Sequence, residues 1–301
     1  MNGTTTAQLA EKTAKAVTGS VEEWTGFLQS AARLYKYSYP EQLLIYAQRP
    51  DATACASYEI WNQTMRRYVR RGARGIALPD GAGAVRYVFD VADTGARKSS
   101  REVKTWALDE NNREAVAHAL ETQYGSAAKL GIAGQLEEIA MQQSMDYWQW
   151  HQDELRSIVD GSSLEGYDEL NLEIAFRNTA AASVKYMLLS RCNLAREYQI
   201  EPEELAGILE WNTSAASGAL GSAVSELSEG VLRQIERTIR QYERSQIHDE
   251  RTDVYEERRV LDSRSDSSRT VGDTEQIRTD AGMVSEGASD DHLQQPASER
   301  E

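Results

Sequence analysis

The residues most able to do chemistry in this chain are five arginines within nine positions, with no acidic residue among them. They are Arg66, Arg67, Arg70, Arg71 and Arg74. A guanidinium group matches phosphate oxygens with paired N–H donors and stacks on planar bases. Gly72 and Gly75 lie in the same run and allow the backbone to approach a ligand closely. The run predicts a phosphate-binding surface, and a solvated, charged hairpin is the alternative.

Aromatic residues are interspersed with basic residues around this arginine run. Tyr37, Tyr68 and Trp61 are the candidates for stacking on bases, although a place in the core is favoured for Trp61. Basic residues that would extend the surface are Arg49, Arg86, Arg97, Lys98, Arg101 and Lys104. Basic residues combined with aromatic platforms are typical of proteins that bind single strands without reading their sequence.

Other chemistries find less support in the sequence. The four histidines are far apart, and residues 150–154 lack the second histidine of an HExxH zinc motif. No phosphate-binding GxxxxGK[ST] motif and no nucleophile elbow occur. Two cysteines, Cys55 and Cys192, are too few for a disulfide framework, and Cys192 is expected to pack in a helical core. The sequence therefore predicts a protein that is not an enzyme, with no cofactor and no metal.

The net charge of −15 over 301 residues is unevenly distributed. Residues 33–104 hold 13 Lys and Arg against 7 Asp and Glu, a net of +6. Residues 246–301 hold 7 basic and 15 acidic residues, a net of −8, and the remaining residues are also acidic. The N-terminus has no apolar signal segment, and no apolar run reaches the roughly 18–20 residues of a membrane span. We therefore expect a soluble cytoplasmic protein with one basic module and no membrane partner.

The periodicity predicts an α+β module over residues 21–106, preceded by a disordered N-terminus over 1–20. Residues 21–36 have helical spacing, and Ser38 and Glu41 form the pattern of a capping box at the start of a second helix that ends before Pro50. A short helix is expected over 57–65. Strands are expected at 68–69, 75–78 and 84–91, in a small antiparallel sheet with a turn at 81–83.

The rest of the chain divides into an all-helical region over 107–245 and a disordered acidic tail over 246–301. Apolar residues recur at three- and four-residue spacing in segments near 110–124, 133–159, 167–197, 202–211 and 214–244. The tail contains a single aromatic residue, Tyr255, and too few apolar side chains to offset the entropy of an ordered chain.

Residues 35–79 resemble the N-terminal single-stranded-DNA-binding domain of ArdC-type antirestriction proteins. The shared elements are Tyr37-Ser38, Leu43-Leu44-Ile45, Gln48, Ala52-Thr53, Trp61, Val69, Arg71-Gly72, Gly75-Ile76 and Pro79, followed by Phe89-Asp90-Val91-Ala92-Asp93-Thr94. They occur in the family's order and cover roughly a third of the chain. The resemblance implies that this module binds single-stranded DNA.

The arginine run and the resemblance together predict a set of DNA-binding residues. They are Arg66, Arg67, Arg70, Arg71, Arg74, Tyr37, Ser38, Gln42, Gln48, Trp61 and Tyr68. One position departs from the family, which usually has Asn where this chain has Glu41. A carboxylate there would repel phosphate, and the capping box assigns it a structural task instead.

A wider resemblance extends over about residues 21–245. It is to the N-terminal region of very large proteins of conjugative elements and phages, and it includes Asn178–Leu194 and Leu220–Glu243. Their helicase and methylase motifs are absent here, as is the zinc protease-like domain of full ArdC proteins. The resemblance implies a non-enzymatic single-stranded-DNA-binding protein of a mobile element, in an antirestriction context, with a helicase or methylase as a partner protein. The alternative is a protein-interaction scaffold, or a DNA-mimic inhibitor acting through the acidic helical region.

Overall fold

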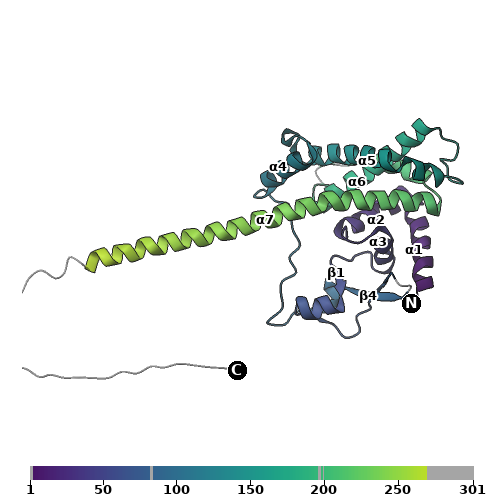
Figure 1. Ribbon diagram of the computed structural model, residues 1–301. Coiled ribbons are helices and arrows are strands. Elements are labelled where there is room, and N and C mark those ends of the chain that lie inside the picture. Colours follow the sequence, from purple (N-terminus) through teal and green to yellow (C-terminus); the bar gives the residue numbers. More distant parts are fainter. Residues whose placement is uncertain (1–2, 82–83, 196–197, 199, 270–301) are drawn as a thin grey trace, which may run out of the picture. The chain divides into compact units, whose positions relative to one another are not determined.

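The computed structural model describes residues 3–81, 84–195, 198 and 200–269, and for 248–269 only the backbone is described. The fold is α+β, as the sequence predicts, with two small antiparallel sheets among many helices (Figure 1). The chain divides into two compact units, Met1–Gln246 and Ile247–Glu301. None of the described helices combines the length and the apolar character that a membrane crossing requires.

Three helices open the first unit: α1 Gly3–Val17, α2 Val21–Arg33 and α3 Tyr39–Gln48. The Ser20 hydroxyl accepts a hydrogen bond from the Glu23 amide at the start of α2. At the start of α3, the Glu41 carboxylate accepts from the backbone N–H of Ser38 at 3.2 Å, which confirms the predicted capping box.

Helix α1 corrects the prediction that residues 1–20 are disordered. Ala14 and Val17 are buried in the main core, and Leu9 and Ala10 pack against a second, smaller core. These side chains share one face of the helix because they recur at three- and four-residue spacing. The many threonines conceal that pattern in the sequence, yet Thr6 and Thr13 are buried with their hydroxyls bonded to backbone carbonyls one turn earlier.

Five short strands form the two sheets. They are β1 Cys55–Ser57, β2 Tyr68–Val69, β3 Ile76–Pro79, β4 Val85–Asp90 and β5 Thr94–Gly95, with the π-helical turn η1 Ile60–Thr64 after β1 and the 3₁₀ turn η2 Val91–Asp93 after β4. The larger sheet has the order β1-β4-β3, with Ala56 opposite Phe89 and Ile76 opposite Val88. The smaller sheet pairs β2 with β5, with Tyr68 opposite Gly95.

The helical region begins after a connecting segment. Its elements are α4 Arg113–Tyr124, η3 Ala128–Leu130, α5 Gly131–Ser157, α6 Glu169–Arg191, η4 Pro202–Glu210 and α7 Ser214–Arg269. Helix α4 ends at Gly125, whose φ of +74° is the left-handed conformation that favours glycine at a helix end. Helix α7 continues past Ser245 to Arg269, within the range where the sequence predicts no structure; residues 270–301 of that range lie outside the described residues.

One hydrophobic core joins the module predicted over 21–106 to the helices that follow it. Trp24 and Phe27 from α2 belong to the same buried cluster as Phe176 from α6 and Trp211. The indole N–H of Trp24 donates to the Ser183 hydroxyl on α6 at 3.0 Å. Residues 1–246 are therefore one compact unit, and the basic module is mounted on a helical scaffold.

Candidate nucleic-acid interface

The small sheet β2–β5 brings two basic segments together. The Arg70 N–H donates to the Asp93 carbonyl at 2.8 Å, and the Arg101 N–H donates to the Met65 carbonyl at 2.9 Å. Arg66 has a φ of +54°, and its carbonyl accepts from the Ser100 hydroxyl at 2.6 Å. These bonds hold residues 65–70 against residues 93–101. We call the basic residues gathered there the arginine patch: Arg66, Arg67, Arg70, Arg71, Arg97, Lys98 and Arg101.

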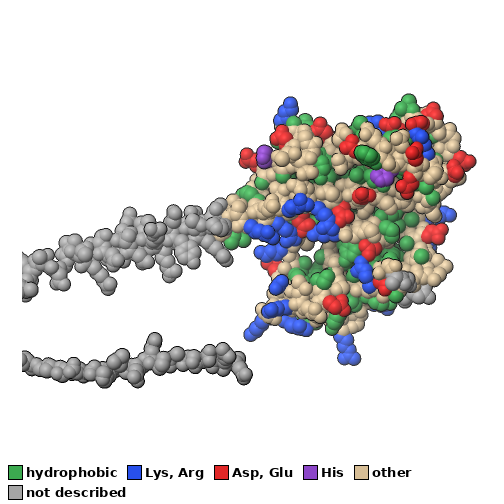
Figure 2. All heavy atoms as spheres, viewed as in Figure 1, with side chains coloured by type: hydrophobic (Ala, Val, Ile, Leu, Met, Phe, Trp, Pro, Cys, Tyr) green, Lys and Arg blue, Asp and Glu red, His purple; other side chains and the backbone are tan. Residues whose placement is uncertain are grey.

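The charges of the arginine patch have no acidic partner among the described residues. Arg67 donates to the Thr94 hydroxyl at 2.8 Å and Arg70 to the Ala92 carbonyl at 3.2 Å, which are both neutral groups. The side chain of Arg71 is exposed and has no partner among the described residues. Lys and Arg side chains gather along the edge of the molecule where the sheets lie (Figure 2). Among the described residues, the patch therefore carries a concentrated positive charge that no carboxylate neutralises.

Tyr68 is the aromatic residue that this surface presents. It is 41% exposed, and the guanidinium of Arg97 lies 5.5 Å from its ring centroid. The ring packs so closely on Gly95 that a Cβ at Gly95 would lie 2.3 Å from it. The glycine therefore allows Tyr68 to pack at this position, and the surface presents an aromatic ring next to a guanidinium.

Arg74 does not join the patch through any contact. It lies beyond Gly72, whose φ is +87°, and directly before the larger sheet. Its side chain is exposed and has no partner among the described residues. Arg66, Arg67 and Arg70 are thus bonded to the segment that follows β4, whereas Arg71 and Arg74 are exposed on either side of the turn at Gly72.

Three predicted contact residues form hydrogen bonds within the fold. Trp61 is only 3% exposed, and its indole N–H donates to the Phe89 carbonyl at 2.8 Å. The Tyr37 hydroxyl donates to the Cys55 carbonyl at 2.8 Å, and burial raises the pKa of Tyr37. Gln42 is 1% exposed, and its amide donates to the Tyr37 carbonyl at 2.8 Å. Trp61 and Gln42 therefore have almost no accessible surface for a base or a phosphate, whereas Tyr37 is half-buried.

Ser38 and Gln48 are also engaged in the fold. The Ser38 hydroxyl donates to Glu41 at 3.1 Å within the capping box. The Gln48 amide accepts from the Ala77 N–H at 3.0 Å and donates to the Ala77 carbonyl at 3.0 Å. Gln48 thus pairs with the edge of β3 as a neighbouring strand would, which satisfies backbone groups that are otherwise unpaired.

Two of the extending basic residues are neutralised by carboxylates. Arg86 forms an ion pair with Glu41 at 2.5 Å. Glu41 is the residue that departs from the ArdC pattern, and its carboxylate is neutralised by this arginine. Arg49 forms an ion pair with Asp93 and lies 3.7 Å from Asp51. Arg97, Lys98 and Arg101 belong to the arginine patch, and Lys104 lies 3.8 Å from Glu102 with both side chains exposed.

The His and Cys residues are the other candidate ligands or nucleophiles in the sequence, and the structure places Cys192 and His151 in the helical region. Within the described ranges, no three His, Cys, Asp or Glu side chains lie close enough to hold a metal ion. Cys192 is buried, and burial raises the pKa of its thiol to about 12, as a core cysteine requires. His151 stacks on Tyr147 with ring centroids 3.9 Å apart.

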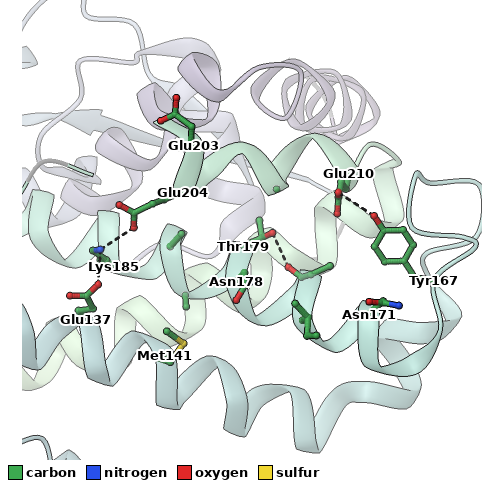
Figure 3. A pocket seen from close by; sticks show the side chains of 15 residues that line it. Glu137, Met141, Tyr167, Asn171, Asn178, Thr179, Lys185, Glu203, Glu204 and Glu210 are labelled. Atoms are coloured by element: carbon green, nitrogen blue, oxygen red, sulfur yellow. Dashed lines mark hydrogen bonds and ion pairs between the residues drawn. The ribbon is translucent and has the colours of Figure 1, made fainter. Parts of the chain in front are cut away.

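A hollow in the helical region lies between α5, α6 and η4. It is an open groove of about 560 Å³. At one end Lys185 lies between Glu137 at 2.8 Å and Glu204 at 3.0 Å, and at the other end the Tyr167 hydroxyl points to Glu210 (Figure 3). We call it the acidic groove. Its floor is made of small side chains, which include Ala175, Ala182 and Gly207.

An ionic network between the module and α7 is centred on the buried carboxylate of Glu236. Glu236 accepts from the Tyr35 hydroxyl at 2.5 Å, lies 2.6 Å from the Lys36 ammonium and 2.7 Å from the Arg240 guanidinium. The Tyr35 hydroxyl in turn accepts from the indole N–H of Trp106 at 3.1 Å. In the sequence, only the four-residue spacing of Glu236 and Arg240 indicates an ion pair, because the other partners of Glu236 are about two hundred residues away.

Comparison with known proteins adds no family to this geometry. No family model, no curated protein and no solved structure matches the chain. The resemblance of residues 35–79 to ArdC-type domains therefore stays a prediction from the sequence, and the interface is judged by its own chemistry.

Proposed function

We propose that this protein binds single-stranded DNA through the arginine patch, without catalysing a reaction. The observation that carries the proposal is a set of seven cations on one surface that have no carboxylate partner among the described residues. Guanidinium groups pair with phosphate oxygens, and the exposed Tyr68 adds a platform for one base. The resemblance to ArdC-type domains favours the same ligand.

Several features favour single strands over duplex DNA. The patch rests on two-residue strands and a short loop, and no helix or long ribbon projects from it to enter a major groove. The Tyr68 ring requires an unpaired base for stacking. Contacts to phosphates and one stacked base carry little sequence information, so we expect weak sequence preference.

Fluorescence anisotropy with a labelled oligothymidylate of about 10 nucleotides tests this function. We expect saturable binding that weakens steeply with salt, with a slope of log K against log salt of about −0.7 for each phosphate contact. A duplex of the same length should bind more weakly. Absence of any salt-sensitive binding to the single strand would refute the proposal.

The acidic groove supports a second candidate function, the recruitment of a cationic partner protein through the helical region. Lys185 is neutralised by its two carboxylate partners, so Glu203 and Glu210 leave the groove with net negative charge. Exposed apolar side chains of Met141 and Ile174 line it as well. Small floor residues and an apolar, acidic wall suit an amphipathic helix with basic residues.

A groove-filling substitution tests this second function. The side chain of Asn178 is exposed and lines the groove, so Asn178→Trp occupies it without entering the core. With a labelled Lys/Leu amphipathic peptide, we expect this variant to bind about tenfold more weakly, a loss of about 1.4 kcal/mol. Asn111→Trp, another exposed Asn outside the groove, is the matched control. Equal affinity of both variants would exclude the groove as the docking site.

A further inference from the structure

A second basic feature lies where the module meets α6 and α7. It is a cavity of about 170 Å³ whose wall includes five cations, Arg33, Lys36, Lys104, Arg191 and Arg240. We call it the junction cavity. Glu236 is the one carboxylate among its lining residues, and it is already paired with Lys36, Arg240 and the Tyr35 hydroxyl. The cavity therefore keeps an excess of positive charge.

Arg191, like Arg33, is a cation of this wall that forms no ion pair with a described residue. Its guanidinium stacks on the Trp106 ring at 3.4 Å from the centroid and donates to the Trp106 carbonyl at 2.9 Å. No carboxylate lies within ion-pair distance of it among the described residues. A partly buried charge without a counter-ion is costly, so an anionic group from outside would stabilise it. Arg191 also lines a second hollow of about 450 Å³, together with the hydroxyls of Thr53, Thr105 and Ser190.

The junction cavity continues the arginine patch along the chain. Lys104 lines the cavity and lies three residues after Arg101, which is bonded to the patch through its backbone. Lys104 is 77% exposed and has only the equally exposed Glu102 nearby, at 3.8 Å. The segment 97–104 therefore carries four basic side chains and one carboxylate, Glu102, between the sheet β2–β5 and the cavity, a net charge of +3.

The positive surface goes on along α7. Arg237 and Arg244 flank Arg240 at three- and four-residue spacing, so all three share one face of the helix. Arg237 and Arg244 are exposed and form no ion pair with any described residue. Figure 2 shows a second gathering of Lys and Arg side chains over α7, next to the basic edge of the module.

We propose that the bound single strand does not end at the arginine patch but continues across the junction cavity onto this face of α7. One phosphate would lie at Arg191 and Lys104, and the following phosphates at Arg237 and Arg244. The inference rests on the proposed function and deepens it, because it sets the length and direction of the binding path. A short oligonucleotide occupies the patch alone, and a long one occupies both parts.

The test compares oligothymidylates of about 6 and about 20 nucleotides on the full chain. Wild type should bind the long strand more tightly and with a steeper salt slope. Arg237→Gln/Arg244→Gln should make the slope on the long strand shallower by about 1.4, or about 0.7 for each lost contact, and leave the short strand unaffected. Lys104→Gln, at a mostly exposed position, should show half of that change and does not depend on α7.

Lys12→Gln/Lys15→Gln is the matched control, because it removes two exposed charges from α1, which belongs to neither basic surface. It should bind both strands as wild type does. Equal binding of the long strand by wild type and the α7 variant would overturn the extended path while the patch remains a binding site. If wild type binds neither strand, the proposed function fails and the extension fails with it.

Discussion

Replacing Arg70 and Arg71 with glutamate is expected to abolish the binding of single-stranded oligonucleotides. The double substitution changes the local charge by four units at the centre of the arginine patch. Two attractive contacts with phosphates become repulsive ones. For any binding that is still measurable, the slope of log K against log salt should be shallower by about 1.4, because two contacts are lost. Anisotropy at low salt is the measurement, because screening is weakest there.

The fold should survive this substitution. The side chain of Arg70 donates only to the Ala92 carbonyl, at 3.2 Å, and Arg71 is exposed without a partner among the described residues. The bond from Arg70 to Asp93 uses the backbone N–H, which glutamate retains. Thermal unfolding should therefore be within a few degrees of wild type, since surface substitutions rarely exceed about 0.5 kcal/mol.

Lys12→Glu/Lys15→Glu provides the same change of net charge on α1 and should keep most of the binding. This control distinguishes a loss of binding caused by the position of the two arginines from a loss caused by the more negative net charge of the whole chain. If both double variants lose binding equally, the arginine patch is not the site. If neither loses binding, DNA contacts the protein elsewhere.

Glu236→Gln is expected to lower the free energy of unfolding by about 2 kcal/mol at neutral pH, because charge-assisted hydrogen bonds contribute about 1.5–3 kcal/mol each and relaxation recovers part of the loss. The carboxylate is only 10% exposed and joins Tyr35, Lys36 and Arg240. An amide has no charge for the two cations, and its NH₂ group faces donors. Urea denaturation of both proteins measures the difference.

The pH dependence of this effect has a definite sign. Burial alone would raise the pKa of Glu236, but hydrogen bonds from Lys36, Tyr35 and Arg240 outweigh it and lower the pKa from 4.5 to about 2. A carboxyl whose pKa is lower in the folded state stabilises the protein above its unfolded pKa. That contribution is lost as pH falls from about 4.5 towards 2. The gap between wild type and Glu236→Gln should therefore be full at pH 7 and narrow steadily below pH 4.5.

Glu229→Gln is the control on the same helix. Glu229 pairs with Arg233 at 2.6 Å in the same i,i+4 geometry that joins Glu236 to Arg240, but it has no further partner in the network. Exposed pairs of this kind contribute about 0.3–0.5 kcal/mol, so this variant should unfold almost as wild type does. A gap for Glu236→Gln that does not change between pH 7 and pH 3 would show that packing, not charge, holds the junction.

Much of the local structure is legible in the sequence, because its causes are local. Ser38 and Glu41 are three residues apart, and the capping box that they predict is present. The alternation over 84–91 predicts strand β4, and the change from helical to strand spacing marks the α+β module. The arginine run is visible for the same reason. Helix α1 was missed because its buried threonines read as polar, although their hydroxyls are bonded within the helix.

For the predicted site, the sequence identifies suitable residue types but not the direction in which each side chain points. Trp61 and Tyr37 are aromatic residues of the kind that stacks on bases, but both are tied to backbone carbonyls inside the fold. Tyr68 has the same chemistry and is exposed. The difference depends on Gly95 and on the pairing of β2 with β5, which no short stretch of sequence encodes.

The sequence by itself was enough to predict a basic module in an acidic chain, the arginines within that module, and most of the helices and strands that carry them. Those properties depend on composition and on spacing over a few residues. Only the tertiary structure decided which charges remain free, because neutralisation depends on partners far along the chain. Glu41 holds Arg86, Asp93 holds Arg49 and Glu236 holds Lys36, while the patch cations meet no carboxylate among the described residues. Long-range packing thus converts a general excess of positive charge into one defined surface.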